Sequence, residues 1–159
     1  IIGLDYSFNM VHHAQKKAKI KEKSEEFIFV QGDGENLPFA ENSFDALTIS
    51  YGFRNIGHFE QAMAEFYRVL KPGGICAVLE FQEPRSKVFG KIYQFYFKYI
   101  LPRVGAFFAR SDAYRYLPES VQNFLKREEI IKLMNSKGFV NIKCEDLTFG
   151  VTSLFTARK

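Results

Sequence analysis

Apolar and polar residues follow two different spacings through the middle of the chain. Residues 44–49 form a short apolar and β-branched run bounded by turn residues, which is typical of a buried strand. Residues 59–70 then follow helical spacing, and the apolar residues available for one face are Phe59, Met63, Phe66, Val69 and Leu70. A second apolar run covers residues 75–81. This order of strand, helix and strand predicts an α/β fold with a parallel sheet.

The end of the predicted helix carries stop signals. Lys71 lies where a cation complements the helix dipole. Pro72 and the pair Gly73-Gly74 then end the helical pattern. We therefore expect the helix to reach this segment and the next strand to begin at Ile75.

The same patterns predict elements on both sides of this unit. On the N-terminal side they indicate strands at residues 1–4 and 26–31, joined by a helix that Ser7 caps. On the C-terminal side, residues 127–137 read as a helix that Gly138 stops. Two final strands, at residues 139–144 and 147–156, are expected to pair antiparallel at the edge of the sheet.

Composition narrows the class of protein without deciding its function. The 159 residues suit one domain, and 47% hydrophobic and 25% charged residues are typical of a soluble globular protein. The net charge of +4 permits attraction to anionic membranes or nucleic acid but proves neither. No apolar run approaches the roughly 20 residues that cross a bilayer, and no signal peptide is evident.

Metal and nucleic-acid sites are not predicted. Cys76 and Cys144 lack metal-ligand spacing and suggest a reducing compartment, and the adjacent His12 and His13 point to different sides of a helix. The lysines of residues 16–23 read as a solvated helix end, because no aromatic or base-reading partner is nearby. Contact of these lysines with acidic lipid headgroups stays open as a weaker alternative.

Several motifs carry a family resemblance. The segments GDGENLPFAENSFDALTIS and RVLKPGG resemble the core of a class I methyltransferase that uses S-adenosylmethionine. The segments YGFRN, LEF and YRYLPES, at residues 51–55, 79–81 and 114–120, make the match more specific. Together, in this order and spacing, they are similar to the ubiquinone/menaquinone biosynthesis C-methyltransferase family. The resemblance implies a Rossmann-like sheet with an antiparallel last strand.

The resemblance also implies that part of the fold is missing. Nothing in the chain matches the glycine-rich loop that follows the first strand of this fold, where the lack of a side chain lets the backbone approach the cofactor. By resemblance, that strand belongs between the strands at residues 1–4 and 44–49. We therefore expect an N-terminally truncated single domain over residues 1–159, with a gap in its sheet. Whether this chain alone is active stays open.

The resemblance assigns cofactor contacts to four residues. Asp5 ends the second strand of the family's sheet, where an acid binds the ribose hydroxyls, although it also suits a turn or a helix start. Asp33 would accept a hydrogen bond from the adenine amino group and Gly34 would keep the approach open, although Asp-Gly is also a common turn. Ser50 would contact the cofactor where its pocket meets the substrate pocket.

The resemblance places the reaction chamber beside residues 51–55. Arg54 would orient a quinol oxygen or stabilise its anion, or else pair structurally with a carboxylate such as Glu80. Glu80 would act on a quinol proton or hold an arginine. Arg115 and Tyr116 offer further donors for the quinol oxygens. His58 reads as an ordinary loop residue.

An aromatic stretch at residues 88–108 lies inside an insertion at about 85–125 that we expect to form a helical lid. It serves either core packing, or a lid over a prenyl tail, or peripheral contact with a membrane. The resulting expectation is a cytoplasmic methyltransferase, with peripheral contact at the inner face of the membrane left open, acting on a prenylated quinol of menaquinone or ubiquinone synthesis. The alternatives are a methyltransferase of another lipid-like or small substrate and a non-catalytic methyltransferase-like fragment.

Overall fold

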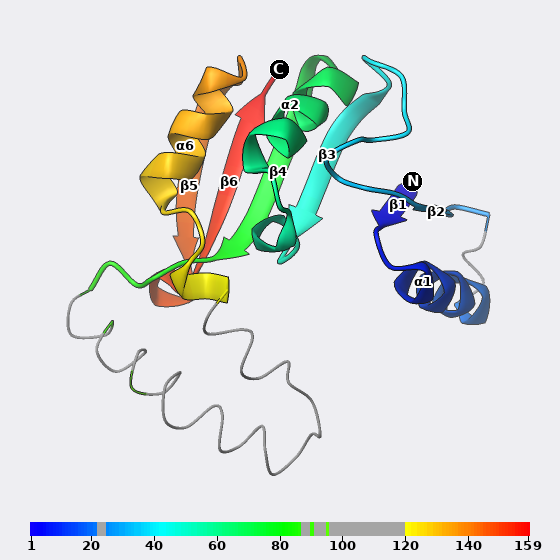
Figure 1. Ribbon diagram of the computed structural model, residues 1–159, viewed down its shortest axis with the longest axis horizontal. Coiled ribbons are helices and arrows are strands. Elements are labelled where there is room, and N and C mark those ends of the chain that lie inside the picture. Colours follow the sequence, from blue (N-terminus) through cyan, green and yellow to red (C-terminus); the bar gives the residue numbers. More distant parts are fainter. Residues whose placement is uncertain (22–24, 87–89, 91–94, 96–119) are drawn as a thin grey trace.

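The chain forms two β-sheets, joined by one loop, in a computed structural model that describes residues 1–21, 25–86, 90, 95 and 120–159. The first sheet has two parallel strands, β1 (Ile2–Asp5) and β2 (Ile28–Gln31), which helix α1 (Phe8–Ile20) connects. Ser7 caps α1, as predicted, by accepting a hydrogen bond from the amide of Met10. In Figure 1 this unit lies on the β3 side of the larger sheet.

The larger sheet has four strands in the order β3-β4-β6-β5. The strands β3 (Phe44–Ser50) and β4 (Leu70–Phe81) are parallel, and the helix between them is α2 (Phe59–Val69). The strands β5 (Val140–Leu147) and β6 (Thr152–Arg158) are antiparallel, and β6 also pairs antiparallel with β4. The predicted β-α-β unit and mixed sheet are therefore confirmed.

The predicted boundaries were wrong at two places. Helix α2 ends at Val69, before the Pro-Gly-Gly segment, and Leu70 already has extended backbone angles (φ −75°, ψ 141°). The Lys71 ammonium lies 2.8 Å from the Asp45 carboxylate of β3 rather than at the helix end. At the C-terminus, the short 3₁₀ turn Thr148–Gly150 delays β6 to Thr152. The strands β5 and β6 still pair antiparallel at one end of the sheet, as predicted, with β5 outermost.

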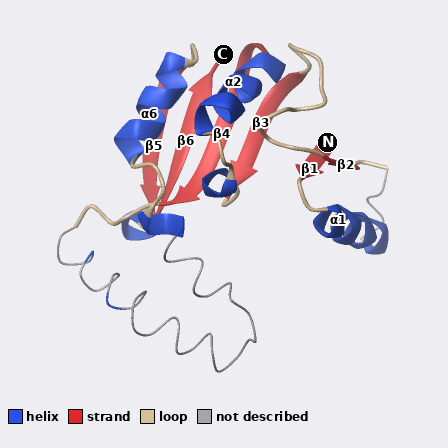
Figure 2. Cartoon of the chain, in the orientation of Figure 1, coloured by secondary structure: helices blue, strands red, loops and turns tan. Residues whose placement is uncertain are grey.

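One face of the four-stranded sheet carries α2 and α6 (Arg127–Ser136), as Figure 2 shows. Helix α6 ends as predicted before Gly138, whose positive φ of 96° favours glycine. The core lies between these helices and the sheet. Its aromatic centre is Phe53, which is fully buried and makes ring contacts with Phe59, Phe66 and Phe124.

Phe53 should therefore be a major contributor to the stability of the four-stranded sheet. We predict that Phe53→Ala lowers the free energy of unfolding by about 3–5 kcal/mol, because it leaves a cavity among three rings. Urea unfolding measures the change. The control is Val140→Ala on the edge strand, where 53% exposure predicts a change within about 0.5 kcal/mol. Equal losses in the two variants would contradict this picture of the core.

Candidate functional site

The carboxyl ends of β1 and β2 bring Asp5 and Asp33 together. The backbone amide of Gly32 donates to the Asp5 carbonyl at 3.1 Å, so the segment after β2 begins beside the end of β1. Each carboxylate uses Oδ1 in a local turn: Asp5 accepts from the Ser7 amide at 2.8 Å, and Asp33 from the Glu35 amide at 2.9 Å. Both side chains are exposed. These turn bonds use Oδ1 and leave Oδ2 of each acid as an acceptor for a ligand.

The loop after β2 packs closely on the chain around it. A Cβ at Gly34 would lie 3.3 Å from Cδ1 of Ile56, and one at Gly32 would lie 2.8 Å from Cδ1 of Leu4. A side chain at Gly32 would force Leu4 to move, and one at Gly34 would press on Ile56. Both glycines therefore have a packing role inside the protein.

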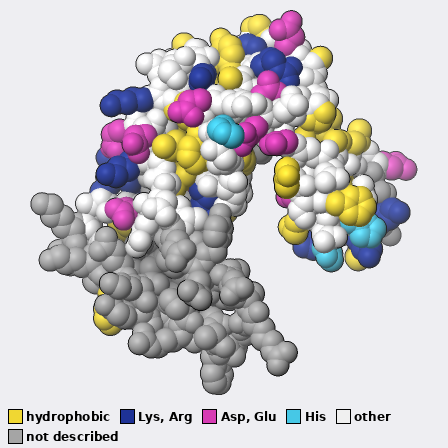
Figure 3. Space-filling view, in the orientation of Figure 1, with side chains coloured by type: hydrophobic (Ala, Val, Ile, Leu, Met, Phe, Trp, Pro, Cys, Tyr) yellow, Lys and Arg dark blue, Asp and Glu magenta, His cyan; other side chains and the backbone are white. Residues whose placement is uncertain are grey.

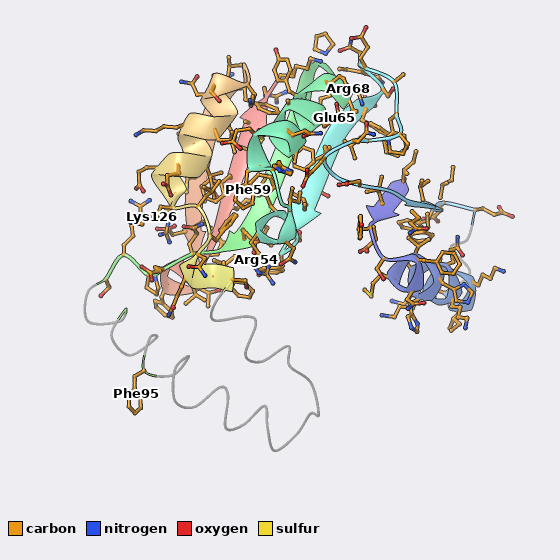
Figure 4. The ribbon with its side chains drawn as sticks, viewed as in Figure 1. Arg54, Phe59, Glu65, Arg68, Phe95 and Lys126 are labelled. Carbon is orange, nitrogen blue, oxygen red and sulfur yellow. The ribbon has the colours of Figure 1, made fainter. Side chains whose placement is uncertain are left out.

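A row of polar residues on α2, which we call the α2 polar row, binds the backbone of this loop. The row is Gln61, Glu65 and Arg68, and Glu65 and Arg68 lie together on α2 in Figure 4. Gln61 donates to the carbonyl of residue 35 at 3.0 Å, and Glu65 accepts from the amide of residue 37 at 2.8 Å.

Arg68 completes the attachment of this loop. It donates to the carbonyls of residues 37 and 39 at 3.0 and 2.7 Å, and its guanidinium forms an ion pair with Glu65 at 2.6 Å. The pairing raises the pKa of Arg68 and lowers that of Glu65. The loop that carries Asp33 is thus attached to α2 by four hydrogen bonds to its backbone.

Glu35 links the same loop to the turn after β3. Its Oε1 accepts hydrogen bonds from the amides of Gly57 and His58, both at 2.9 Å, and its Oε2 lies 2.6 Å from Nδ1 of His58. Figure 3 shows a histidine beside acidic side chains on this face of the molecule. The hydrogen bond with Glu35 raises the pKa of His58 and lowers that of Glu35. His58 is therefore the ion-pair partner of Glu35 and not an ordinary loop residue.

Ser50 ends β3 and Tyr51 follows it. Ser50 is exposed and is paired in register with Leu79 of β4. Tyr51 has a positive φ of 54°, and its amide donates to the Leu79 carbonyl at 2.8 Å. Glu35 and His58 connect the segments that follow β2 and β3, so these two segments lie beside each other. Asp5, Asp33 and Ser50 each lie at or just after the carboxyl end of a strand.

Arg54 pairs with Glu80, one of the alternatives that the sequence left open. Glu80 is fully buried at the end of β4, and its Oε1 lies 2.8 Å from Nη1 of Arg54, whose side chain is only 10% exposed. Glu80 also accepts from the backbone amides of Arg54 and Phe81. Arg54 further donates to the Tyr51 carbonyl and, at 3.4 Å, to Oγ of Ser120. Because a buried carboxylate is costly unless it is paired, Glu80 and Arg54 stabilise each other.

Part of the predicted site lies outside the described residues. These are Arg115 and Tyr116 and nearly all of the aromatic stretch 88–108, of which Gly90 and Phe95 are described.

Burial raises the pKa of the Cys76 thiol to about 12, which fits a packing residue. Across residues 1–21, 25–86, 90, 95 and 120–159, no three His, Cys, Asp or Glu side chains gather as a metal site would require. No helix in that part of the chain is both long and apolar enough for a bilayer crossing.

Sequence reasoning missed two features of this site. The α2 polar row was visible as residues 61, 65 and 68, whose spacing places them on one helix face. The Glu35–His58 pair had no such signal, because its partners belong to different loops.

The family model for the ubiE/COQ5 methyltransferase family matches residues 1–159 of this chain. The chain belongs to this family. Relatives agree with the match. The ubiquinone/menaquinone biosynthesis C-methyltransferase UbiE of Geobacter sulfurreducens is 40% identical over all of this chain, which spans 62% of that protein. The demethylmenaquinone methyltransferase of Deinococcus radiodurans is also 40% identical, and the chain spans 65% of it. The chain thus spans less than two thirds of the length of these two family members.

Solved structures share the fold of this chain. A SAM-dependent methyltransferase from Aquifex aeolicus superposes with a TM-score of 0.68 at 13% identity, covering 99% of this chain and 67% of that one. A SAM-dependent methyltransferase from Thermotoga maritima gives a TM-score of 0.66 at 21% identity, covering 99% and 72%. At these identities the likeness shows the α/β fold alone.

The Glu35–His58 pair predicts a pH-dependent link between the two loops. The pKa of His58 is raised, so its contribution to stability is complete below the ordinary value of 6.5 and is lost as pH rises through the folded value. The pKa of Glu35 is lowered, so its contribution is present above 4.5 and is lost as pH falls through the folded value. We predict that a double-mutant cycle of Glu35→Gln and His58→Asn gives a larger coupling energy at pH 6 than at pH 9. A coupling that does not change with pH would show that the ion pair adds nothing to the neutral hydrogen bonds.

Proposed function

We propose that the whole protein is an S-adenosylmethionine-dependent C-methyltransferase whose substrate is a prenylated quinol of menaquinone or ubiquinone synthesis. The observation that carries this proposal is that Asp5, Asp33 and Ser50 all lie at or just after the carboxyl ends of strands, and that the Arg54–Glu80 pair holds the segment that follows Ser50. Ligands of open α/β sheets bind at the carboxyl ends of their strands. Family membership and the names of the relatives support the choice of reaction and substrate.

The residues present fit the cofactor. Asp5 and Asp33 are exposed and each uses Oδ1 in a turn bond, so Oδ2 of Asp5 would accept from the ribose hydroxyls and Oδ2 of Asp33 from the adenine amino group. Gly34, whose missing side chain leaves room for Ile56, is proposed also to let the adenine ring approach the backbone of the loop. Ser50 would contact the cofactor from β3. When bound, the cofactor supplies an electrophilic methyl group on sulfur.

We also propose that the two sheets of this chain belong to one sheet in the whole protein. Among the described residues, β1 pairs only with β2, and β3 pairs only with β4, so each leaves one strand edge unpaired. The loop after β2 is hydrogen-bonded through Glu35 to the turn that follows β3, which supports a common place for these strands in one sheet. We infer that in the whole protein a parallel strand fills the place between β1 and β3 and carries the glycine-rich cofactor loop. The greater length of the relatives supports this inference.

The reaction itself requires little acid–base chemistry. Ionisation of a quinol hydroxyl would place negative charge on the adjacent ring carbon, to which bound S-adenosylmethionine would supply its methyl group while the sulfur keeps the electrons of the carbon–sulfur bond. The hydroxyl proton and the hydrogen of that carbon would pass to water, and loss of the hydrogen would restore the aromatic ring. Holding the ring carbon in line with the methyl group provides most of the acceleration.

Arg54, Arg115 and Tyr116 are proposed to donate hydrogen bonds to the phenolate oxygen as charge develops on it. Arg54 is paired with buried Glu80, so the site carries less net positive charge than it would with an unpaired guanidinium. Arg54 would therefore act as a directional donor. The insertion at about 85–125, as a lid or as a peripheral membrane contact through residues 88–108, stays a prediction.

Calorimetric titration with S-adenosylmethionine tests the cofactor site. In the whole protein, we predict that Asp33→Ala weakens binding by about one to two decades, because a hydrogen bond to a charged acceptor contributes roughly 1.5–3 kcal/mol. The matched control is Asp45→Ala, which removes an acid that is 87% exposed and lies at the opposite end of β3. Unchanged affinity in Asp33→Ala, or an equal loss in both variants, would contradict the assignment.

The same titration distinguishes the alternatives. We expect binding by the whole protein and weak or no binding by residues 1–159 alone, because the proposed strand and glycine-rich loop are absent from this chain. Tight binding by residues 1–159 would contradict the proposed strand. Binding by neither would favour a non-catalytic protein. Binding by the whole protein without methylation of a prenylated naphthoquinol or benzoquinol would favour another substrate.

A further inference from the structure

Tyr51 has an unusual backbone conformation at the end of β3. Its φ of 54° lies in the left-handed region, which is unfavourable for a residue that carries a side chain. Two hydrogen bonds hold it there: its amide donates to the carbonyl of Leu79, and its own carbonyl accepts from Nη1 of Arg54 at 2.5 Å. The Arg54–Glu80 pair thus fixes a conformation that glycine would adopt at less cost. Strain of this kind is found most often at binding and active sites.

The strained backbone presents an aromatic surface. The ring of Tyr51 packs on the ring of Phe81 with centroids 4.6 Å apart and planes tilted by 34°. The guanidinium carbon of Arg54 lies 5.4 Å from the centroid of the Phe81 ring. Tyr51 nevertheless remains 39% exposed, whereas the aromatic residue two positions later, Phe53, is fully buried. The pair is therefore anchored to the sheet and still offers part of the Tyr51 ring to the outside.

We propose that this Tyr51–Phe81 pair, which we call the aromatic pair, binds the flat ring of the substrate by stacking. Tyr51 directly follows Ser50, the proposed cofactor contact, so a ring stacked on it would lie next to the methyl donor. Aromatic rings prefer offset or edge contacts at centroid distances of about 4.5–7 Å, and a pair already fixed in place loses little entropy when a third ring joins it. The identity of that ring rests on the proposed function, whereas the stacking surface rests on the geometry alone.

The aromatic pair has features that a simple packing contact does not require. Burial of an aromatic side chain needs neither a left-handed backbone nor an arginine bonded to its carbonyl. The position of Arg54, between Glu80 and Tyr51, ties the orientation of the pair to the buried carboxylate of β4. Both rings come from the ends of neighbouring parallel strands, where ligands of this class of sheet bind.

Calorimetry with menadione, a flat naphthoquinone without a tail, tests the proposal in the whole protein. Tyr51→Phe keeps the ring and should bind menadione within about twofold of the unsubstituted protein. Tyr51→Leu keeps the apolar bulk and the backbone strain but removes the ring, so we expect the dissociation constant to rise by about three- to tenfold. Thermal unfolding and titration with S-adenosylmethionine are measured for each variant. The unfolding temperature and the affinity for S-adenosylmethionine should be nearly the same in the two variants.

Two results would overturn the proposal. The first is equal menadione affinity in the two variants. The second is a loss in Tyr51→Leu that is matched by loss of S-adenosylmethionine binding or of thermal stability, because this would show a packing role. Methylation of a prenylated naphthoquinol by the unsubstituted protein separates this test from the proposed function. Methylation with equal menadione affinities would refute stacking alone, whereas absence of methylation would refute the proposed function and leave the stacking test valid.

Discussion

The attachment of residues 35–39 to the α2 polar row is the constraint on which the site depends. Glu65 and Arg68 bind the backbone at residues 37 and 39, and Gln61 binds it at residue 35. The opposite side of the same helix buries Met63 and Phe66 in the core. Helix α2 therefore packs against the four-stranded sheet with one side and holds residues 35–39 with the other. Because β1 and β2 form a separate sheet, this loop is what positions Asp33 relative to the end of β3.

Charged groups reinforce this arrangement at two further points. The Glu35–His58 pair ties the loop to the turn after β3, and the Arg54–Glu80 pair fixes the segment that follows Ser50. The first pair is exposed on the histidine side and therefore sensitive to pH and salt. The second is nearly buried, and removing one partner would leave an uncompensated charge. The two pairs thus differ in role. The Glu35–His58 pair links the loop to the turn after β3 in a pH-dependent way, whereas the Arg54–Glu80 pair fixes the ends of β3 and β4.

Much of the fold could be predicted because its signals are local. The apolar run of β3, the helical spacing of α2 and the glycine after α6 each act through neighbours in the sequence. The end of α2 could not be predicted so well, because the ladder between Phe44 and Leu70 draws the chain into β4 before Pro72 is reached. The Glu35–His58 ion pair could not be predicted, since its partners are 23 positions apart in different loops, whereas the Arg54–Glu80 pair was one of the alternatives that the sequence left open.

Hydrogen exchange at the amides of residues 33–39 tests the central claim most directly. In Arg68→Met the helix keeps its length and apolar contacts, but the carbonyls of residues 37 and 39 lose their donor. We predict that these amides exchange at least about tenfold faster, while the amides of β4 and β6 keep their protection. We also predict that Lys132→Met on α6, which replaces an exposed cation outside the α2 polar row, changes the exchange of neither group of amides. Unchanged exchange at residues 33–39 in Arg68→Met would show that something other than α2 holds the loop that carries Asp33.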